Sequence, residues 1–449
     1  MRIRFFNAVI YTPEEQRTFS GEVWVKDERI ERVIRNTDIR EDGNGSDACY
    51  TDGEDALPGD GESGQFDEEI DCRENLLMPG FKNCHAHGPM TFLRSYADDL
   101  PLQQWLNEKI FPAEALLKRE DIYALMQLAI LEYLKSGITT SFEMYFYPDM
   151  IAQACLDMGF RVVISGTVFG QENQVDEAVR TLTEDYETYH GYHSLVDYRL
   201  GFHSEYSCCR TLLKEIAALS RQYHAPVYMH NSETRREVLE CINRNGVTPV
   251  VLMEKLGLFE YGGAGHHMLY TTDEDRKILK ERGIYVVTNP SSNLKLASGI
   301  APLKDYLEYG IQAAIGTDGP ASNNSLNFFK ELYLTAALQK VKYQDPAAVT
   351  PEQVLQMAVK NGAELLGLSE ANGVSEGKLA DLILIDLRSP NMQPASQILH
   401  HLVYSGSMDN VLMTMVGGRI LYRDGLFPLV PDPDVIYQQA NRIMKRICS

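Results

Sequence analysis

Several side chains in this sequence are of the types, and at the spacing, that a catalytic metal ion requires. His85 and His87 are separated by one residue, so an extended segment aims both imidazoles to the same side. His230 and Asp318 follow short apolar runs much farther along the chain. A catalytic divalent ion takes three or four nitrogen and oxygen ligands and keeps an open position for water. These four residues therefore predict a mononuclear metal site.

The chemistry expected of such a site is hydrolysis. A divalent ion lowers the pKa of its bound water to about 7, which makes hydroxide available at neutral pH. Imidazole and carboxylate ligands together favour zinc, with iron(II) as the second choice. Removal of an amino group from a heterocycle also needs a proton on the ring nitrogen beside the attacked carbon. Glu233, close behind His230, is the candidate proton carrier, and a solvated glutamate at a helix start is the alternative interpretation.

The apolar pattern predicts the elements that position these side chains. Between Leu76 and about residue 370, short apolar runs alternate with helical stretches. Eight such alternations predict an α/β fold of the (β/α)8 type, a TIM barrel. The expected strands cover residues 76–84, 138–144, 161–167, 198–203, 226–230, 262–267, 284–289 and 311–317.

Six of the eleven histidines fall near the ends of these expected strands. They are His85, His87, His203, His230, His266 and His267. Asp318 follows the last expected strand. Because barrel enzymes build their sites at the carboxyl ends of the strands, this placement supports one shared site. The remaining histidines are expected in helices or loops, as ordinary core or surface residues: His190, His193, His224, His400 and His401.

The first 35 residues carry a different pattern, in which apolar and polar side chains alternate. Such alternation predicts short antiparallel strands with one buried face. We expect turns between them at Ser20-Gly21 and at Lys26-Asp27.

The C-terminal segment returns to strand character over residues 373–425, and a helical tail is expected over residues 432–447. We expect the two ends of the chain to pair in a small β-sandwich domain. The expected division is residues 1–75 and 373–449 for this second domain, and residues 76–372 for the metal-dependent barrel.

Residues 41–69 form a strongly acidic segment. They hold eleven Asp or Glu, six Gly and no Lys or Arg, which predicts a mobile loop. A metal-binding loop is the alternative, but the segment lacks the ordered ligand spacing of a calcium loop.

Composition limits the possible partners of this 449-residue chain. The net charge of −21 argues against nucleic-acid binding, which needs clustered Lys and Arg. No apolar stretch is long enough for a membrane span, and no signal peptide is recognisable at the start. The eight cysteines include no C-x-x-C pair and are expected to be reduced thiols. We expect a cytoplasmic protein with a small-molecule substrate, and a homo-oligomer remains possible.

Five motifs resemble those of the amidohydrolase superfamily. Within it, the chain is most similar to the methylthioadenosine and S-adenosylhomocysteine deaminases and their chlorohydrolase relatives. The motifs are PGFKNCHAHGPMTFLRSYADDLPLQQWLNEKIFPAE, HSEYSC, MHNSET, NPSSNLKLASGIAPL and GTDGPASNNS, together with the strand signature GKLADLILID near the C-terminus.

The resemblance implies roles for the residues that match the family's motifs. The metal ligands would be His85, His87, His230 and Asp318. Glu233 would be the general acid and base, and His267 would hold the attacking hydroxide. The family motif places that histidine six residues before an acidic helix start, here Asp273, which favours His267 over His266. Asp318 would also take a proton from the water and pass it to the departing ammonia.

Other matching positions are expected to contact the substrate. Trp105 would stack near the base, although a core aromatic residue is an equally good interpretation. Glu114 would bind ribose hydroxyls and His203 would contact the substrate, while Asn293 and Ser322 would line the pocket.

The function expected from this resemblance is hydrolytic deamination of an adenosine-type nucleoside. Adenosine, methylthioadenosine and S-adenosylhomocysteine are the candidates, and the alternative is the same reaction on guanine, a pterin or an s-triazine. Dinuclear amide hydrolysis would need a lysine at the end of the fourth strand, but DYRLGFH contains none. A catalytically inactive scaffold would be expected to lose ligands that this chain retains.

Overall fold

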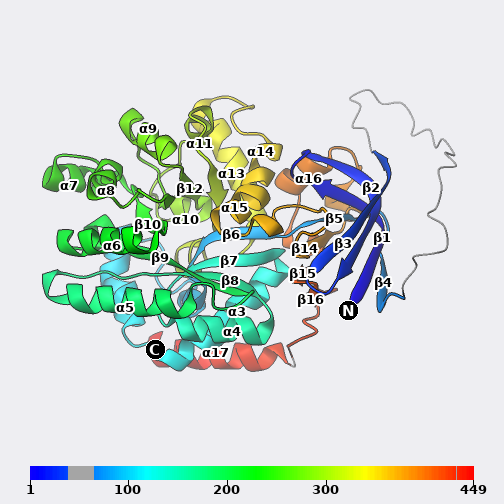
Figure 1. Cartoon of the computed structure of the whole chain (residues 1–449), viewed down its shortest axis with the longest axis horizontal. Coiled ribbons are helices and arrows are strands. Elements are labelled where there is room, and N and C mark those ends of the chain that lie inside the picture. Colours follow the sequence, from blue (N-terminus) through cyan, green and yellow to red (C-terminus); the bar gives the residue numbers. More distant parts are fainter. Residues whose placement is uncertain (39–64, 431, 449) are drawn as a thin grey trace.

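The computed structural model describes residues 1–38, 65–430 and 432–448 and contains two separate β-sheets (Figure 1). The larger part of the chain forms eight parallel strands that neighbour one another in sequence order. They are β6 (Phe81–Ala86), β7 (Ile138–Met144), β8 (Arg161–Ser165), β9 (Val196–Ser204), β10 (Val227–Asn231), β11 (Gly263–His267), β12 (Ile284–Thr288) and β13 (Ala313–Ile315). The expected (β/α)8 barrel is confirmed.

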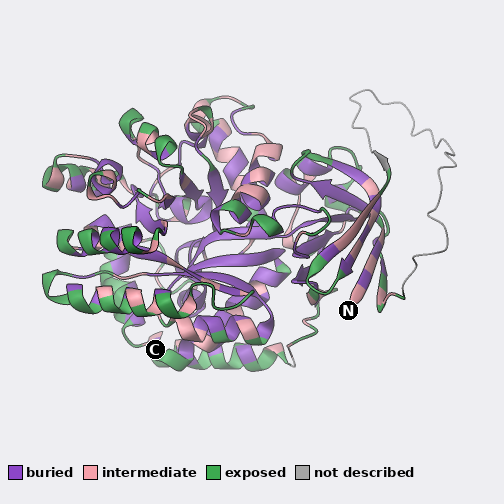
Figure 2. Cartoon of the chain, in the orientation of Figure 1, coloured by how far each residue is buried: buried purple, intermediate pink, exposed green. Residues whose placement is uncertain are grey.

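Helices connect these strands and cover the outside of the barrel (Figure 1). Figure 2 shows that the outward faces of these helices are exposed whereas the strands are buried. In α6, for example, Leu212, Ile216 and Leu219 recur at helical spacing and are buried. The helices are α3 (Arg119–Lys135), α4 (Pro148–Met158), α5 (Val175–Tyr189), α6 (Arg210–Tyr223), α7 (Arg235–Asn245), α8 (Pro249–Leu256), α9 (Asp273–Glu281), α10 (Pro290–Lys295), α11 (Leu303–Glu308), α12 (Pro320–Asn323), α13 (Phe328–Tyr343), α14 (Pro351–Gln356) and α15 (Gly362–Leu365).

Hydrogen bonds hold the last barrel strand beside the first. The side chain of Asn83 donates to Thr317 Oγ1 at 2.7 Å, and Asn83 Oδ1 accepts from the backbone of Thr317 at 2.9 Å. The backbone nitrogen of Asp318 donates to the carbonyl of His85 at 2.9 Å. Segments more than 200 residues apart in sequence thus meet at the carboxyl end of the barrel.

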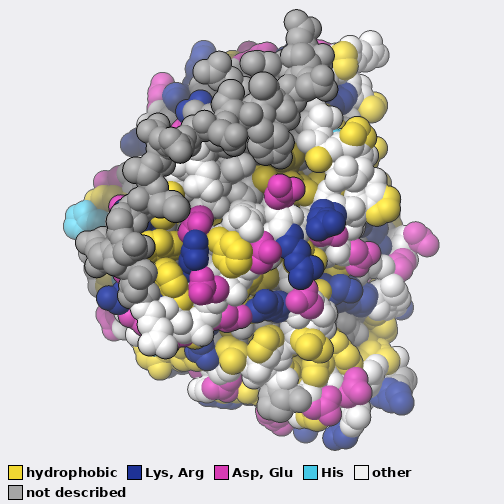
Figure 3. Space-filling view, turned by 90° about the vertical axis from the view of Figure 1, so that its right-hand side faces the viewer, with side chains coloured by type: hydrophobic (Ala, Val, Ile, Leu, Met, Phe, Trp, Pro, Cys, Tyr) yellow, Lys and Arg dark blue, Asp and Glu magenta, His cyan; other side chains and the backbone are white. Residues whose placement is uncertain are grey.

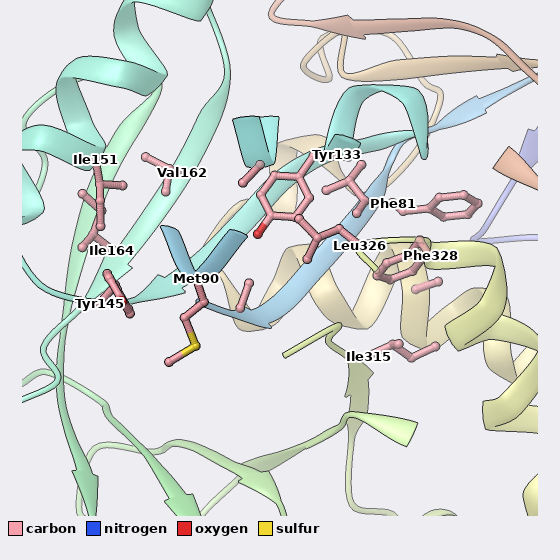
Figure 4. Packing of buried hydrophobic residues seen from close by; sticks show 14 of the residues in the cluster. Phe81, Met90, Tyr133, Tyr145, Ile151, Val162, Ile164, Ile315, Leu326 and Phe328 are labelled. Atoms are coloured by element: carbon pink, nitrogen blue, oxygen red, sulfur yellow. The ribbon is translucent and has the colours of Figure 1, made fainter. Parts of the chain in front are cut away.

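Aromatic packing anchors β6 to α13. Phe81 stacks on Phe328 with the ring centroids 5.1 Å apart (Figure 4). Phe329 meets Phe81 edge-on at a centroid distance of 5.4 Å. All three rings are buried. The strand that carries His85 is therefore held by close packing from its first residue.

The second sheet combines strands from both ends of the chain, as expected. Its order is β16-β15-β14-β5-β1-β2-β3, and β4 pairs with β1. A separate apolar core, with residues such as Phe5, Val23 and Leu382, lies within it. The strands are β1 (Arg2–Thr12), β2 (Arg17–Lys26), β3 (Arg29–Asp38), β4 (Glu68–Asp71), β5 (Leu76–Pro79), β14 (Leu382–Ile385), β15 (Val411–Val416) and β16 (Arg419–Arg423).

Two details of the expected strands are corrected by the structure. The strand expected over residues 76–84 is two strands, since β5 belongs to the terminal sheet and β6 to the barrel, with Gly80 between them. A side chain at Gly80 would collide with Thr139, so the chain can pass between the sheets only with glycine there. The turn expected at Ser20-Gly21 lies inside β2, where the register shifts instead.

The acidic segment expected over residues 41–69 is described only at its end. Glu68 and Glu69 belong to β4, so the segment's last residues form a strand. Residues 39–64 lie outside the described residues. The expected helical tail is α17 (Pro433–Cys448), which packs along α3, where the Arg446 guanidinium pairs with Asp121 (Figure 1).

Charged groups of both signs are mixed on the face of the terminal sheet. Figure 3 shows Lys and Arg beside Asp and Glu over the described part of this face. Arg4, for instance, pairs with Glu22 at 2.8 Å and with Glu69 at 2.9 Å. Among the described residues, no helix has the length and apolar character needed to cross a membrane.

A buried ion pair joins the barrel to the terminal sheet. The Arg161 guanidinium donates to both carboxylate oxygens of Asp381, at 2.7 and 3.0 Å, and both side chains are at most 3% exposed. Burial opposes ionisation of Asp381, but Arg161 lowers the pKa of this carboxyl below its usual value.

Replacing Asp381 by alanine is expected to lower the free energy of unfolding by about 3–5 kcal/mol, because the Arg161 charge stays buried without its partner. The midpoint of urea unfolding at pH 7 measures this loss. Glu240→Ala, which breaks the exposed pair Arg236–Glu240, is the control and should cost less than about 1 kcal/mol. Since the folded pKa of Asp381 is lowered, its contribution is complete above the unfolded pKa of about 3.9 and fades as the pH falls further. Equal losses in the two variants would contradict this account.

Candidate active site

The residues expected to carry chemistry lie at the carboxyl ends of the barrel strands. His85 is in β6, His230 in β10 and His267 at the end of β11. His87 directly follows β6, and Asp318 lies shortly after the end of β13. One pocket opens at this end, and His85 lies fully buried behind it. The expected residues that line the pocket are His87, Trp105, Glu114, His203, His230, Glu233, His267, Asp318 and Ser322.

Four side chains approach one another as the ligands of one ion would. Asp318 Oδ1 lies 3.5 Å from His85 Nε2 and 3.3 Å from His87 Nε2, and His87 Nε2 lies 3.4 Å from His230 Nε2. Ligand atoms at the corners of a tetrahedron with bonds of about 2.0–2.1 Å are separated by about 3.3–3.4 Å. The donor set and its spacing therefore fit a zinc-sized cation.

Backbone carbonyls orient two of these rings. His87 Nδ1 lies 2.6 Å from the carbonyl of Met144, and His230 Nδ1 lies 2.7 Å from the carbonyl of His203. These contacts leave each Nε2 directed toward the common centre, as in metal-binding histidines. The buried Nε2 of His85 has no hydrogen-bond partner among the described residues. A buried polar atom without a partner is rare, and a metal ion would satisfy it.

Asp318 is held by its backbone and by two hydroxyl groups. Its Oδ1 accepts from the backbone of Gly319 at 2.8 Å, and its Oδ2 accepts from Ser292 at 2.6 Å and from Ser322 at 3.1 Å. Its φ of 61° lies in the left-handed region, which is uncommon outside glycine and concentrates at functional sites. Burial opposes ionisation, but contacts with His85 and His87 lower the pKa of Asp318 well below its usual value. Asp318 is therefore a carboxylate at neutral pH.

Glu233 and His267 face each other across the pocket. His267 Nε2 lies 3.9 Å from Glu233 Oε2, and its Nδ1 lies 2.8 Å from Asn293 Oδ1. Glu233 is 5% exposed, and burial raises the pKa of its carboxyl. A glutamate in such surroundings can hold a proton closer to neutral pH than a solvated one.

Glu237, which the sequence analysis did not single out, holds the segment that carries Glu233. Its carboxylate accepts from the backbone nitrogens of Ser232 and Glu233, each at 2.8 Å. The signal in the sequence was the spacing of Thr234 and Glu237, which form a capping box at the start of α7. The carboxylate that caps the helix thus also positions the expected proton carrier.

The structure separates the two adjacent histidines of β11. Both are fully buried, but only His267 lines the pocket, whereas His266 stacks on His85 with ring centroids 3.9 Å apart. The expectation that Asn293 lines the pocket is corrected by the structure. Asn293 lies behind His267 and holds that ring by the hydrogen bond described above.

The outer part of the pocket contains the residues expected to bind substrate. Trp105, at the end of α1 (Leu102–Trp105), is 5% exposed and lines the pocket, so it belongs to both the core and the site. Glu114, at the end of α2 (Phe111–Glu114), accepts a hydrogen bond of 2.6 Å from Tyr145. Tyr145 was not found from the sequence. Figure 4 shows it with Met90 among the packed apolar residues, and both side chains line the pocket.

The model of one protein family, described as the amidohydrolase family, matches residues 76–421 of the chain. The chain belongs to the amidohydrolase family. Both the barrel and part of the terminal sheet lie within the matched range.

Individual relatives of this amidohydrolase carry names of nucleoside deaminases. The chain is 40% identical to a 5-methylthioadenosine/S-adenosylhomocysteine deaminase of Desulforudis audaxviator over 394 residues, which covers 87% of this chain and 91% of the relative. It is also 40% identical to a 5'-deoxyadenosine deaminase of Methanothermobacter thermautotrophicus, covering 81% and 85%. A crystal structure of an adenosine deaminase from Xanthomonas campestris with bound zinc superposes with a TM-score of 0.87 at 28% identity, covering 99% and 98%.

Proposed function

We propose that this amidohydrolase catalyses the hydrolytic deamination of an adenosine-type nucleoside to the inosine-type product and ammonia. The observation that carries the proposal is the meeting of four metal-ligating side chains with a buried glutamate in one pocket. The deaminase names of the relatives support the same reaction. Free base or triazine substrates are the alternative.

The proposed metal ligands are His85, His87, His230 and Asp318, whose contacts are described above, and zinc is the ion that their nitrogen and oxygen donors favour. When bound, the ion supplies an activated water at neutral pH. Among the described residues, every cysteine is free, which fits a reducing, cytoplasmic setting for the enzyme.

Different side chains around this centre carry out the separate proton transfers. Asp318, ionised and held by Ser292 and Ser322, takes a proton from the attacking water. Glu233 donates a proton to the ring nitrogen beside the carbon that carries the amino group. His267, whose Nδ1–H donates to Asn293 Oδ1, presents its Nε2 as a hydrogen-bond acceptor for the attacking water. As the carbon–nitrogen bond breaks, the hydroxyl group of the adduct returns a proton to Glu233 and becomes the ring carbonyl. The amino group leaves as ammonia with the proton that Asp318 took from the water.

Glu114 is the proposed ribose ligand, because a carboxylate accepts hydrogen bonds from two neighbouring hydroxyl groups. Burial raises the pKa of Glu114 to about 7, although the Tyr145 hydroxyl opposes the shift. The fraction ionised therefore increases as the pH rises through neutrality. Nucleosides are expected to bind more tightly over the same range.

Glu114→Gln is expected to raise the KM for nucleosides by about tenfold or more and to have little effect on a free base, because only a ribose offers the hydroxyl pair. The pH dependence of the nucleoside KM should flatten in this variant, since glutamine does not titrate. Steady-state ammonia release from adenosine and from adenine measures both effects. Equal losses on the two substrates would contradict the ribose assignment.

The function is tested by ammonia release from a panel run side by side on zinc-loaded protein. The panel contains adenosine, methylthioadenosine, S-adenosylhomocysteine, guanine and an amino-triazine. We expect the nucleosides to give the highest kcat/KM and one equivalent of metal to be required. Faster turnover of guanine or the triazine would favour the alternative. A folded protein that binds no zinc on loading and releases ammonia from none of the five compounds would overturn the proposal.

A further inference from the structure

Two exposed phenylalanines stand at the outer end of the pocket. Phe111 begins α2, and Phe169 follows β8, and they are 38% and 46% exposed. Their rings lie parallel within 19°, with centroids 6.5 Å apart, and both line the pocket. Large apolar side chains exposed on the wall of a binding pocket are a surface that a ligand can cover.

Ring contacts place this pair at a definite distance from the metal centre. The ring of His203 lies 4.9 Å from that of His230, a proposed metal ligand. The ring of His203 also lies 6.2 Å from that of Phe111 and 6.5 Å from that of Phe169. The two phenylalanines therefore lie one ring beyond His203, on the way from the metal centre to solvent.

The same pair lies close to the proposed ribose ligand. Phe111 and Glu114 are three residues apart in one helix, which places them on the same face. If a ribose binds at Glu114 while its base reaches the metal centre, the group on the 5' carbon continues outward toward the two rings. This order follows from the geometry of a nucleoside, in which the base and the 5' carbon flank the ribose hydroxyls.

The charged side chains of the pocket determine which kind of 5' substituent can bind beside the two phenylalanines. Glu114, Glu233 and Asp318 are among its lining residues, and none of the described residues that line it is Lys or Arg. The outer wall is completed by apolar residues such as Leu102, Leu106 and Phe146. A carboxylate at the 5' end would lose water without gaining a cationic partner, and the nearest of these acidic side chains, Glu114, would repel it when ionised.

We propose that Phe111 and Phe169 form a seat for an apolar 5' substituent, so the preferred substrates are 5'-deoxyadenosines that carry a hydrogen, alkyl or short alkylthio group. Substrates that end in an amino acid are disfavoured. This inference rests on the proposed nucleoside deamination and narrows its substrate class. Each methylene buried between the rings should raise kcat/KM about fourfold.

The test compares kcat/KM for adenosine, methylthioadenosine and S-adenosylhomocysteine on the full-length, zinc-loaded enzyme. Methylthioadenosine is expected to exceed S-adenosylhomocysteine by about tenfold or more. Phe169→Arg should lower the ratio of kcat/KM for methylthioadenosine to that for S-adenosylhomocysteine by about tenfold. The substitution replaces an apolar side chain by a cation that can pair with the carboxylate of S-adenosylhomocysteine. Phe169→Ala should lower kcat/KM for methylthioadenosine more than for adenosine, whose 5' hydroxyl gains less from the ring.

A matched control is available at the opposite end of the barrel. Tyr192 is 54% exposed and precedes the amino end of β9, so Tyr192→Arg adds the same charge far from the pocket. The substrate ratio should be unchanged in this variant.

Equal kcat/KM for methylthioadenosine and S-adenosylhomocysteine would overturn the apolar seat while leaving nucleoside deamination intact. The same holds if Phe169→Arg and Phe169→Ala both keep the wild-type ratios with full zinc content. Absence of ammonia from all three nucleosides would instead overturn the proposed function, and the inference with it.

Discussion

Replacing Asp318 by asparagine is expected to lower kcat by at least about 10³-fold. The substitution keeps the size of the side chain but removes its charge and its capacity to take a proton from water. Asparagine would also direct an NH2 group either toward the imidazoles of His85 and His87 or toward the hydroxyls of Ser292 and Ser322. Both orientations replace an acceptor by a donor where an acceptor is required.

The measurements for Asp318→Asn are kcat for the best nucleoside, metal content per chain and the circular dichroism spectrum. We expect a folded protein with reduced zinc content. Ser322→Ala is the matched control, because it removes one hydrogen bond to Asp318 and keeps the carboxylate, so its loss should stay within about tenfold. An asparagine variant that retains activity within tenfold of the wild type would exclude Asp318 as ligand and base.

Glu233→Gln is expected to lower kcat by about 10²–10⁴-fold, the usual contribution of a positioned acid or base. Glutamine has nearly the same shape but holds no transferable proton. Because burial raises the pKa of Glu233, the native side chain can carry the proton that the ring nitrogen needs. Since Glu233 is not among the proposed ligands, zinc content should be unchanged and KM should change much less than kcat.

Glu237→Gln separates the chemistry of Glu233 from its position. This variant keeps the Glu233 carboxyl but weakens the hydrogen bonds that hold Ser232 and Glu233. We expect a loss of about tenfold, clearly smaller than for Glu233→Gln. If both glutamine variants lost the same activity, the role of Glu233 would be structural and the proton carrier would have to be sought elsewhere.

The sequence alone was sufficient to predict the barrel and the neighbourhood of its site. Eight buried strands alternate with amphipathic helices, and this local pattern permits few packed arrangements. His85, His87, His230 and Asp318 could be assigned to one end because parallel strands present their carboxyl ends on the same face. The second sheet followed from the return of strand character near the C-terminus.

Contacts between distant segments were decided only by the tertiary structure. Periodicity could not tell that β5 joins the terminal sheet, because residues 76–84 are buried throughout and Gly80 alone marks the crossing. Nor could it place Asn293 behind His267, or Phe111 against Phe169. A residue pattern specifies which way a side chain points from its own strand or helix. The distance between two such elements depends on how the whole barrel closes and packs, here through Asn83, Thr317 and the backbone of His85.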